Sequence, residues 1–270
     1  MPEALTQGTV LPAHTPLSAD DQAALSEAVA RLMRSRGLVL RFADMVDGAI
    51  GDVAAASWRR LRLPQGLARQ VRQVAYEALR VGFDVALVGR GRTEFLGTAN
   101  TARLIAATSG AAAGFTGFAG FLPDATATTL LIMRNIAAIA EAEGEDLDEM
   151  VARQACLEVL AFGAPGFTPA PTEDGEAAYW SARLLLHGRP LSLLMSEIAA
   201  GYGIRLSQRL VAAMVPVLGA AAGALVNVSF LDHYRNVARV HFTIRRLERT
   251  YGPGKIRAEA RNLADRAARA

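Results

Sequence analysis

The sequence of 270 residues contains one cysteine, Cys156, and one lysine, Lys255. A single cysteine excludes a disulfide within the chain and a zinc site built from several thiolates, and it is typical of proteins in a reducing compartment. Aromatic residues make up only 6% of the chain. The stacking platforms that bind single-stranded nucleic acid need aromatic side chains interleaved with arginines, so we expect no nucleic-acid partner.

Signatures of the common active sites are also missing. No HExxH motif occurs, and His233 and His241 are separated along one predicted helix by about 12 Å of rise, too far for one metal ion. No GxSxG motif surrounds a serine, and the glycines at 89–97 form neither GxGxxG nor a P-loop. The acidic run 141–149 lacks the EF-hand spacing. We therefore predict no metal and no cofactor, leave catalytic residues unassigned, and expect Cys156 to be a buried structural thiol.

What the chain does have is apolar residues at helical spacing. Apolar residues make up 51% of the chain and charged residues 20%, which excludes a disordered chain and suffices for a sizeable core. No strand-like alternation with regular turn signals appears. The pattern predicts an all-α fold, a compact multi-helix bundle. Residues 1–17 are expected to be a flexible tail without the features of a signal peptide, and 18–270 a single domain.

Capping residues predict where several helices begin and end. Ser18, with Asp20 and Asp21 after it, predicts a helix start. Gly144 predicts the end of a helix that starts at Pro123–Asp124. The remaining predicted helices cover about 38–53, 64–79, 98–113, 146–162, 177–187, 190–200, 204–215, 217–251 and 255–269, and Gly252–Pro253 predicts the end of the longest one.

The predicted helix 217–251 is the longest and has one apolar stripe. The stripe consists of Val237, Val240, Ile244 and Leu247, extended by Phe230 and Tyr251. Four arginines lie off it: Arg235, Arg239, Arg246 and Arg249. This spacing predicts that the helix buries one face and exposes the other.

The four arginines belong to a basic C-terminal part of the chain. Residues 235–269 contain ten basic and three acidic side chains, whereas the whole chain has a net charge of +3. We take Arg235, Arg239, Arg246 and Arg249 as candidates for contact with an anionic surface, and a lipid membrane is the expected partner. A solvated helical face is the alternative. The acidic run 141–149 is either a solvated helix end or faces these basic residues.

Two segments, 104–123 and 210–231, contain no charged residue. Each has about the 20 residues that cross a bilayer, and each has glycines four apart, Gly110 with Gly114 and Gly219 with Gly223, which allow close helix packing. Buried helices, a hairpin inserted into one leaflet and spanning helices all remain open. The polar residues in both segments count against spanning, so we expect peripheral association.

Asp124 and Asn227 are polar residues that adjoin the Gly/Ala-rich segments. A polar side chain at such a place either is capped and satisfied or lines a pocket. We therefore take both, with the four glycines, as candidate lipid, membrane or pocket residues. The dipole at a helix N-terminus is the simplest explanation for Asp124.

Two runs of sequence resemble the EcsC family. SGAAAGFTGFAGFLPDATATTLLIMRNIAAIAEAEGED, from Ser109, is similar to the family's central motif of a Gly/Ala-rich stretch, an acidic-and-proline turn and a helix. VPVLGAAAGALVNVSFLDHYRNVARVHFTIRRL, from Val215, resembles its closing motif of proline, Gly/Ala-rich stretch, asparagine and amphipathic helix. The likeness covers roughly residues 60–252.

The resemblance implies a bacterial protein that is cytoplasmic and peripheral to the inner membrane, with ABC-transporter components as partners. It carries no catalytic residues. The Gly/Ala-rich helices are also loosely similar to plant senescence and spartin-type domains, which associate with lipid. The leading hypothesis is a non-enzymatic, lipid- or membrane-associated protein, accessory to a transporter. The competing hypothesis is a peptidase-like hydrolase whose site forms only in the fold.

Overall fold

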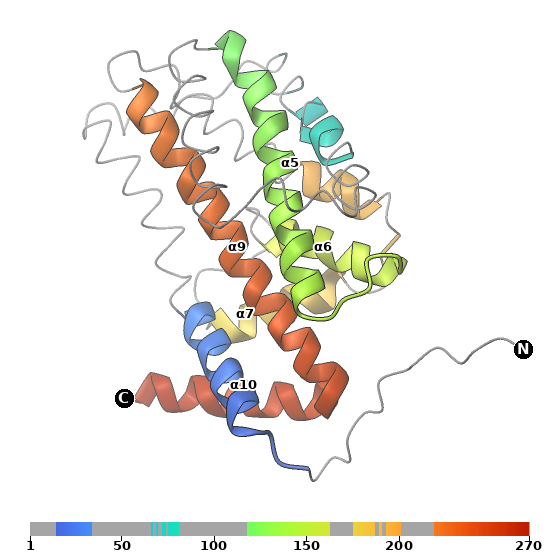
Figure 1. Cartoon of the computed structure of the whole chain (residues 1–270), viewed down its shortest axis with the longest axis vertical. Helices are drawn as coiled ribbons and strands as arrows, with labels where there is room; N and C mark the ends of the chain where they lie inside the picture. The colour runs from blue at the N-terminus through green and yellow to red at the C-terminus, as the bar shows by residue number, and fades with distance from the viewer. Residues whose placement is uncertain are drawn as a thin grey trace, which may run out of the picture.

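The computed structural model describes residues 15–33, 118–162, 175–186, 193–200 and 219–269, together with 66, 69, 72, 73, 75–80, 189 and 190. For 118–126, 178, 219–227, 229 and 230 it describes the backbone alone. Every regular element in these ranges is a helix, which confirms the predicted all-α bundle (Figure 1). The predicted helices 38–53, 98–113 and 204–215 lie outside the described residues.

The main helices match the predicted boundaries closely. They are α5 (Phe118–Ala142), α6 (Met150–Phe162), α7 (Gly175–Leu186), α9 (Gly219–Tyr251) and α10 (Pro253–Arg269). Residues 19–33, 75–80 and 193–200 are also helical. The ends of α6, α7, α9 and α10 lie within a few residues of their predicted positions. The local cap signals in the sequence therefore predict most of the helix boundaries.

The predicted caps take the expected conformations. The hydroxyl oxygen of Ser18 accepts a hydrogen bond from the backbone N–H of Asp21 at 3.1 Å, as a helix N-cap does. Gly144 and Gly252 have φ values of 79° and 86°, the left-handed conformation that closes a helix and favours glycine. Gly144 follows α5, and Gly252 forms the break between α9 and α10.

The predicted start of α5 is wrong. The helix begins at Phe118, so Asp124 lies in its second turn, and the first turn contains no acidic residue. Pro123 is the sixth residue of α5, where proline removes one helix hydrogen bond and crowds the carbonyl four residues earlier, so it lies within the helix at a cost and does not mark the first residue. Asp124 is therefore not a residue of the helix N-terminus.

The helix α9 is the central element, with one apolar cluster on each side. In the first cluster its residues Leu231, Tyr234 and Phe242 pack with α5, α6 and residues 193–200. In the second cluster Val240 and Ile244 pack with helix 19–33, α7 and α10. Of the predicted stripe, Val240, Ile244, Leu247 and Tyr251 are buried and Val237 is partly buried, but the prediction of one buried face is wrong. Neighbouring helices cover α9 on two sides.

The helix α10 lies across the end of α9, beside helix 19–33 (Figure 1). Its residues Ile256, Ala260 and Ala264 recur every four positions and are buried in the second cluster. The four-residue spacing puts these side chains on one face of the helix. The opposite face of α10 consequently points to solvent.

Candidate functional site

The pocket candidates of the sequence fall mostly where no side chain is described. Gly110 and Gly114 lie outside the described residues. Gly219, Gly223 and Asn227 lie at the start of α9, and their backbone is helical. Asp124 is in α5, which packs along α9. Within the described residues, no helix is long and apolar enough to span a bilayer.

Two of the four candidate arginines are engaged in internal ion pairs. Arg246 donates hydrogen bonds from Nε to Glu143 at 2.8 Å and from Nη1 to Asp21 at 2.7 Å. Arg249 donates to the Glu145 carboxylate and, at 2.6 Å, to the backbone carbonyl of Glu143. These arginines therefore hold the loop after α5 and the start of helix 19–33 against α9. Arg239 is exposed, and Arg235 is partly buried.

Glu145 is the centre of this network, which we call the α5–α9 clamp: Glu143, Glu145, Arg245, Arg246 and Arg249. Arg245 donates from Nε and Nη2 to the two oxygens of Glu145, at 2.7 and 3.0 Å. Only 5% of the Glu145 side chain is exposed. Burial by itself raises the pKa of this carboxyl, but the hydrogen bonds and charges of Arg245 and Arg249 hold it below its usual value. The acidic run thus faces the basic residues of α9.

Exposed cations are found instead on α10. Arg257, Arg261, Arg266 and Arg269 are all exposed, and none forms an ion pair with another residue in the described part of the chain. The ring of Trp180 on α7 lies 5.7 Å from the guanidinium carbon of Arg257 and 5.5 Å from that of Arg183. We call Arg257, Arg261, Arg266 and Arg269 the α10 cation face; they are spread over about half of the circumference of α10, and the exposed Asp265 lies among them. The sequence-based candidates Arg235, Arg239, Arg246 and Arg249 do not include these four arginines of α10.

A buried carboxyl lies within the field of the α10 cation face. Glu176 is in the first turn of α7 and is almost fully buried. Burial raises its pKa, while the charges of Arg261 and Arg257 act in the opposite direction. Its negative charge offsets a small part of the positive field.

A polar cluster of Tyr179, His241 and Glu158, which sequence reasoning did not find, lies in the interior where α6, α7 and α9 meet. His241 Nδ1 is 3.0 Å from the hydroxyl oxygen of Tyr179, and its Nε2 is 3.6 Å from a carboxylate oxygen of Glu158. The ring centroid of Phe162 lies 5.1 Å from that of His241, with the two rings tilted by 54°, and Phe162 packs against both apolar clusters. Nothing in the local sequence brings these residues together, because they come from three helices.

Burial determines how these groups titrate. Burial lowers the pKa of His241 well below its usual value, and the charges of Arg183 and Arg245 lower it further. Burial raises the pKa of Tyr179 and of Cys156. Cys156 is fully buried, which confirms the predicted structural thiol. At neutral pH the cluster therefore contains a neutral imidazole and a neutral phenol, and the Cys156 thiol is protonated.

The His241 pKa predicts a pH dependence of stability. Since the pKa is lower in the folded than in the unfolded chain, the unfolded chain binds more protons below pH 6.5, the ordinary value. Stability is therefore present above about pH 6.5 and is lost as the pH falls, by roughly 1.4 kcal/mol per unit. Urea unfolding of the wild type between pH 7.5 and 5 should show this slope.

The matched variant is His241→Gln, which keeps a polar side chain beside Tyr179 but cannot titrate. Its slope between pH 7.5 and 5 should be smaller than that of the wild type by the histidine contribution. The pKa of Glu145 is lowered, so its contribution falls below about pH 4.5, outside this window. The pKa of Glu176 is raised, which gives a slope of opposite sign in both proteins. Equal slopes for the two proteins would contradict the prediction.

A comparison with models of protein families shows which family this chain belongs to. The EcsC protein family model matches residues 92–247, more than half of the chain. The chain belongs to the EcsC protein family. No curated protein and no solved structure matches it. The EcsC match includes α5, α6 and α7 and ends within α9, so the α10 cation face lies beyond the matched range.

Proposed function

We propose that this EcsC-family protein is a peripheral, non-enzymatic membrane protein whose α10 cation face binds anionic lipid. The observation that carries the proposal is the exposure of Arg257, Arg261, Arg266 and Arg269 on one short helix. The α5–α9 clamp already engages the arginines near the end of α9. An accessory role beside an ABC transporter at the cytoplasmic face of the inner membrane is part of the same proposal and rests on the family resemblance.

The energetics suit reversible binding. A cation near an anionic membrane surface contributes roughly 1 kcal/mol, and salt screens this attraction with a Debye length of about 8 Å at physiological strength. The apolar face of α10 is packed inside the protein, so α10 can present its cations without leaving the fold. We therefore expect binding that depends on anionic lipid and weakens with salt.

Co-flotation with vesicles tests the α10 cation face. The variant Arg257→Gln, Arg261→Gln, Arg266→Gln, Arg269→Gln should bind phosphatidylserine-containing vesicles about 30-fold more weakly than the wild type. This corresponds to about 2 kcal/mol, if half of the four cations contact headgroups at once. Both proteins should bind pure phosphatidylcholine vesicles much more weakly than the wild type binds the anionic ones.

The matched control removes the same charge elsewhere. Four other exposed arginines lie outside α10: Arg69, Arg72, Arg80 and Arg239. Their replacement by Gln should leave most of the binding intact. An equal loss in both variants would show that net charge alone matters. Failure of the wild type to float at low salt, or its retention through carbonate washing, would overturn the peripheral proposal.

A hydrolase remains the second candidate because Tyr179, His241 and Glu158 lie in the order of a nucleophile, a base and an orienting carboxylate. Their burial favours a structural role, since a substrate needs access to the reacting atoms. The 3.6 Å between His241 and Glu158 also exceeds a normal hydrogen bond. Ester or peptide hydrolysis that Tyr179→Phe abolishes without unfolding the protein would favour the enzyme.

A further inference from the structure

Three leucines are exposed where α7 ends and the next helical segment begins. The exposed fractions are 74% for Leu184, 56% for Leu185 and 47% for Leu193. Leu186, the next residue of α7, is fully buried, so the chain at this point places one leucine in the core and two outside. We call Leu184, Leu185 and Leu193 the leucine edge. Single exposed leucines are common, but a group of three near one turn is characteristic of a contact surface.

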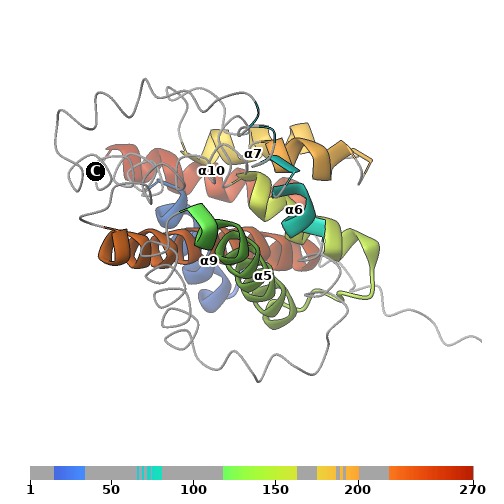
Figure 2. The same cartoon turned by 90° about the horizontal axis from the view of Figure 1, so that it is seen from above.

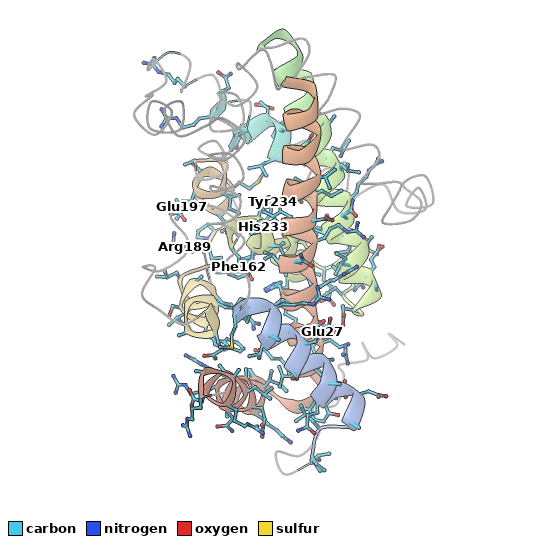
Figure 3. The ribbon with its side chains drawn as sticks, turned by 90° about the vertical axis from the view of Figure 1, so that its left-hand side faces the viewer. Glu27, Phe162, Arg189, Glu197, His233 and Tyr234 are labelled. Atoms are coloured by element: carbon cyan, nitrogen blue, oxygen red, sulfur yellow. The ribbon has the colours of Figure 1, made fainter. Side chains whose placement is uncertain are left out.

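Polar contacts hold the leucine edge in its exposed position. Arg183 donates two hydrogen bonds to the carboxylate of Glu248 on α9, at 2.8 and 2.6 Å, which fixes the rotation of α7 about its axis. Arg189 donates from Nε to the carbonyl of Leu185 at 2.6 Å and forms an ion pair with Glu197 (Figure 3). These contacts hold both the end of α7 and the helical segment 193–200. The leucines therefore cannot turn into the core without breaking them.

Leu184 of the leucine edge lies near Arg257 of the α10 cation face. The helices α7 and α10 pack together and lie on the side of the molecule opposite α5 (Figure 2). Arg257 contacts the ring of Trp180, and Leu184 follows Trp180 by one turn of α7, about 6 Å of rise. An apolar edge beside a row of cations complements an anionic bilayer, which offers acyl chains directly beneath its charged headgroups.

We propose that Leu184, Leu185 and Leu193 insert between the lipids of an anionic membrane while the α10 cation face contacts the headgroups. This inference rests on the proposed function and assigns the apolar part of the same surface. Cations alone give binding that salt abolishes, whereas buried leucines add a component that salt does not screen. The membrane-bound protein should therefore keep measurable affinity at salt concentrations that screen the arginines.

The first experiment compares two triple variants by vesicle flotation. Leu184→Ser, Leu185→Ser, Leu193→Ser should weaken binding to phosphatidylserine-containing vesicles about a hundredfold and remove the salt-resistant component. This effect corresponds to burial of part of each leucine, at about 1.4 kcal/mol per tenfold. The matched control replaces exposed apolar residues elsewhere, Tyr76→Ser, Met150→Ser, Val151→Ser, and should bind like the wild type. All three proteins should unfold at similar temperatures, because the replaced side chains are exposed.

The second experiment reports insertion directly and does not need a loss-of-function variant. An environment-sensitive fluorophore is attached to the new cysteine of the variant Leu185→Cys and, as a control, to that of Val151→Cys. The native Cys156 is buried and protected from labelling. On addition of phosphatidylserine-containing vesicles, the emission at position 185 should shift to the blue and be quenched by lipids brominated on the acyl chain. The emission at position 151 should not change.

The outcomes separate this inference from the proposed function. If the wild type binds in a salt-dependent manner but the leucine variant binds equally well and the fluorophore at 185 stays in water, the inference is overturned and the α10 proposal stands. If the wild type never binds, both fail. If the fluorophore shifts without lipid and the leucine variant changes the oligomeric state, the edge is a protein interface and the inference is again overturned.

Discussion

Replacing Glu145 by alanine should lower the free energy of unfolding by about 3–5 kcal/mol. The Glu145 carboxylate is bound by Arg245 and Arg249, and its side chain is 5% exposed. Removing it leaves two guanidinium groups without their acceptor in a partly buried place, which is the costly way to break such a pair. Urea unfolding followed by circular dichroism at pH 7 measures the change.

Glu149 is the matched control, since it is exposed in the same acidic run. Glu149→Ala should change the stability by no more than about 0.5 kcal/mol. Glu145→Gln, which keeps an acceptor oxygen, should fall between the two. A loss below 1 kcal/mol for Glu145→Ala would show that water replaces the carboxylate and that the clamp does not hold the fold together.

The basic C-terminal part of the chain contains two sets of cations, those of the α5–α9 clamp and those of α10. Up to Tyr251, the arginines of the clamp neutralise the carboxylates of the loop after α5. After Gly252 the chain changes direction, and the cations of α10 face solvent. Net charge counted over 235–269 therefore combines arginines that are paired in the clamp with arginines that are exposed, and the proposed membrane binding depends on the exposed ones.

Local chemistry explains which parts of the fold the sequence could predict. Ser18, Gly144 and Gly252 act through their own backbone and nearest neighbours, so their patterns located helix ends without any knowledge of the tertiary structure. Helical periodicity likewise predicted the all-α class. Pro123 misled the prediction because proline is compatible with either the first or a later turn near a helix start.

Long-range pairing explains what the sequence could not predict. Glu145 and Arg245 are 100 residues apart, and no local pattern distinguishes the arginines that bind carboxylates from those that stay exposed. The contact of His241 with Tyr179 joins residues 62 apart, on different helices. The leucine edge is equally hidden, because Leu184, Leu185 and Leu186 form one apolar run in which only the fold determines which member is buried.

Replacing Phe242 by alanine should lower the free energy of unfolding by about 3–5 kcal/mol. Phe242 lies off the apolar stripe predicted for α9, two residues before Ile244, and on the sequence pattern alone its replacement would cost little. In the structure its side chain is fully buried in the first apolar cluster, against α5 and α6. Truncation removes apolar contacts and leaves a cavity that close-packed neighbours fill only in part.

Arg239→Ala provides the comparison, because Arg239 lies on α9 three residues earlier and is exposed. It should change stability by no more than about 0.5 kcal/mol, and Phe242→Leu, which retains most of the volume, should cost less than Phe242→Ala. Ile244→Ala, on the opposite side of α9, should cost about 2–5 kcal/mol. Large losses of stability for both Phe242→Ala and Ile244→Ala would show that α9 is covered on two sides. A small loss at Phe242 alone would restore the single buried face that the sequence predicts.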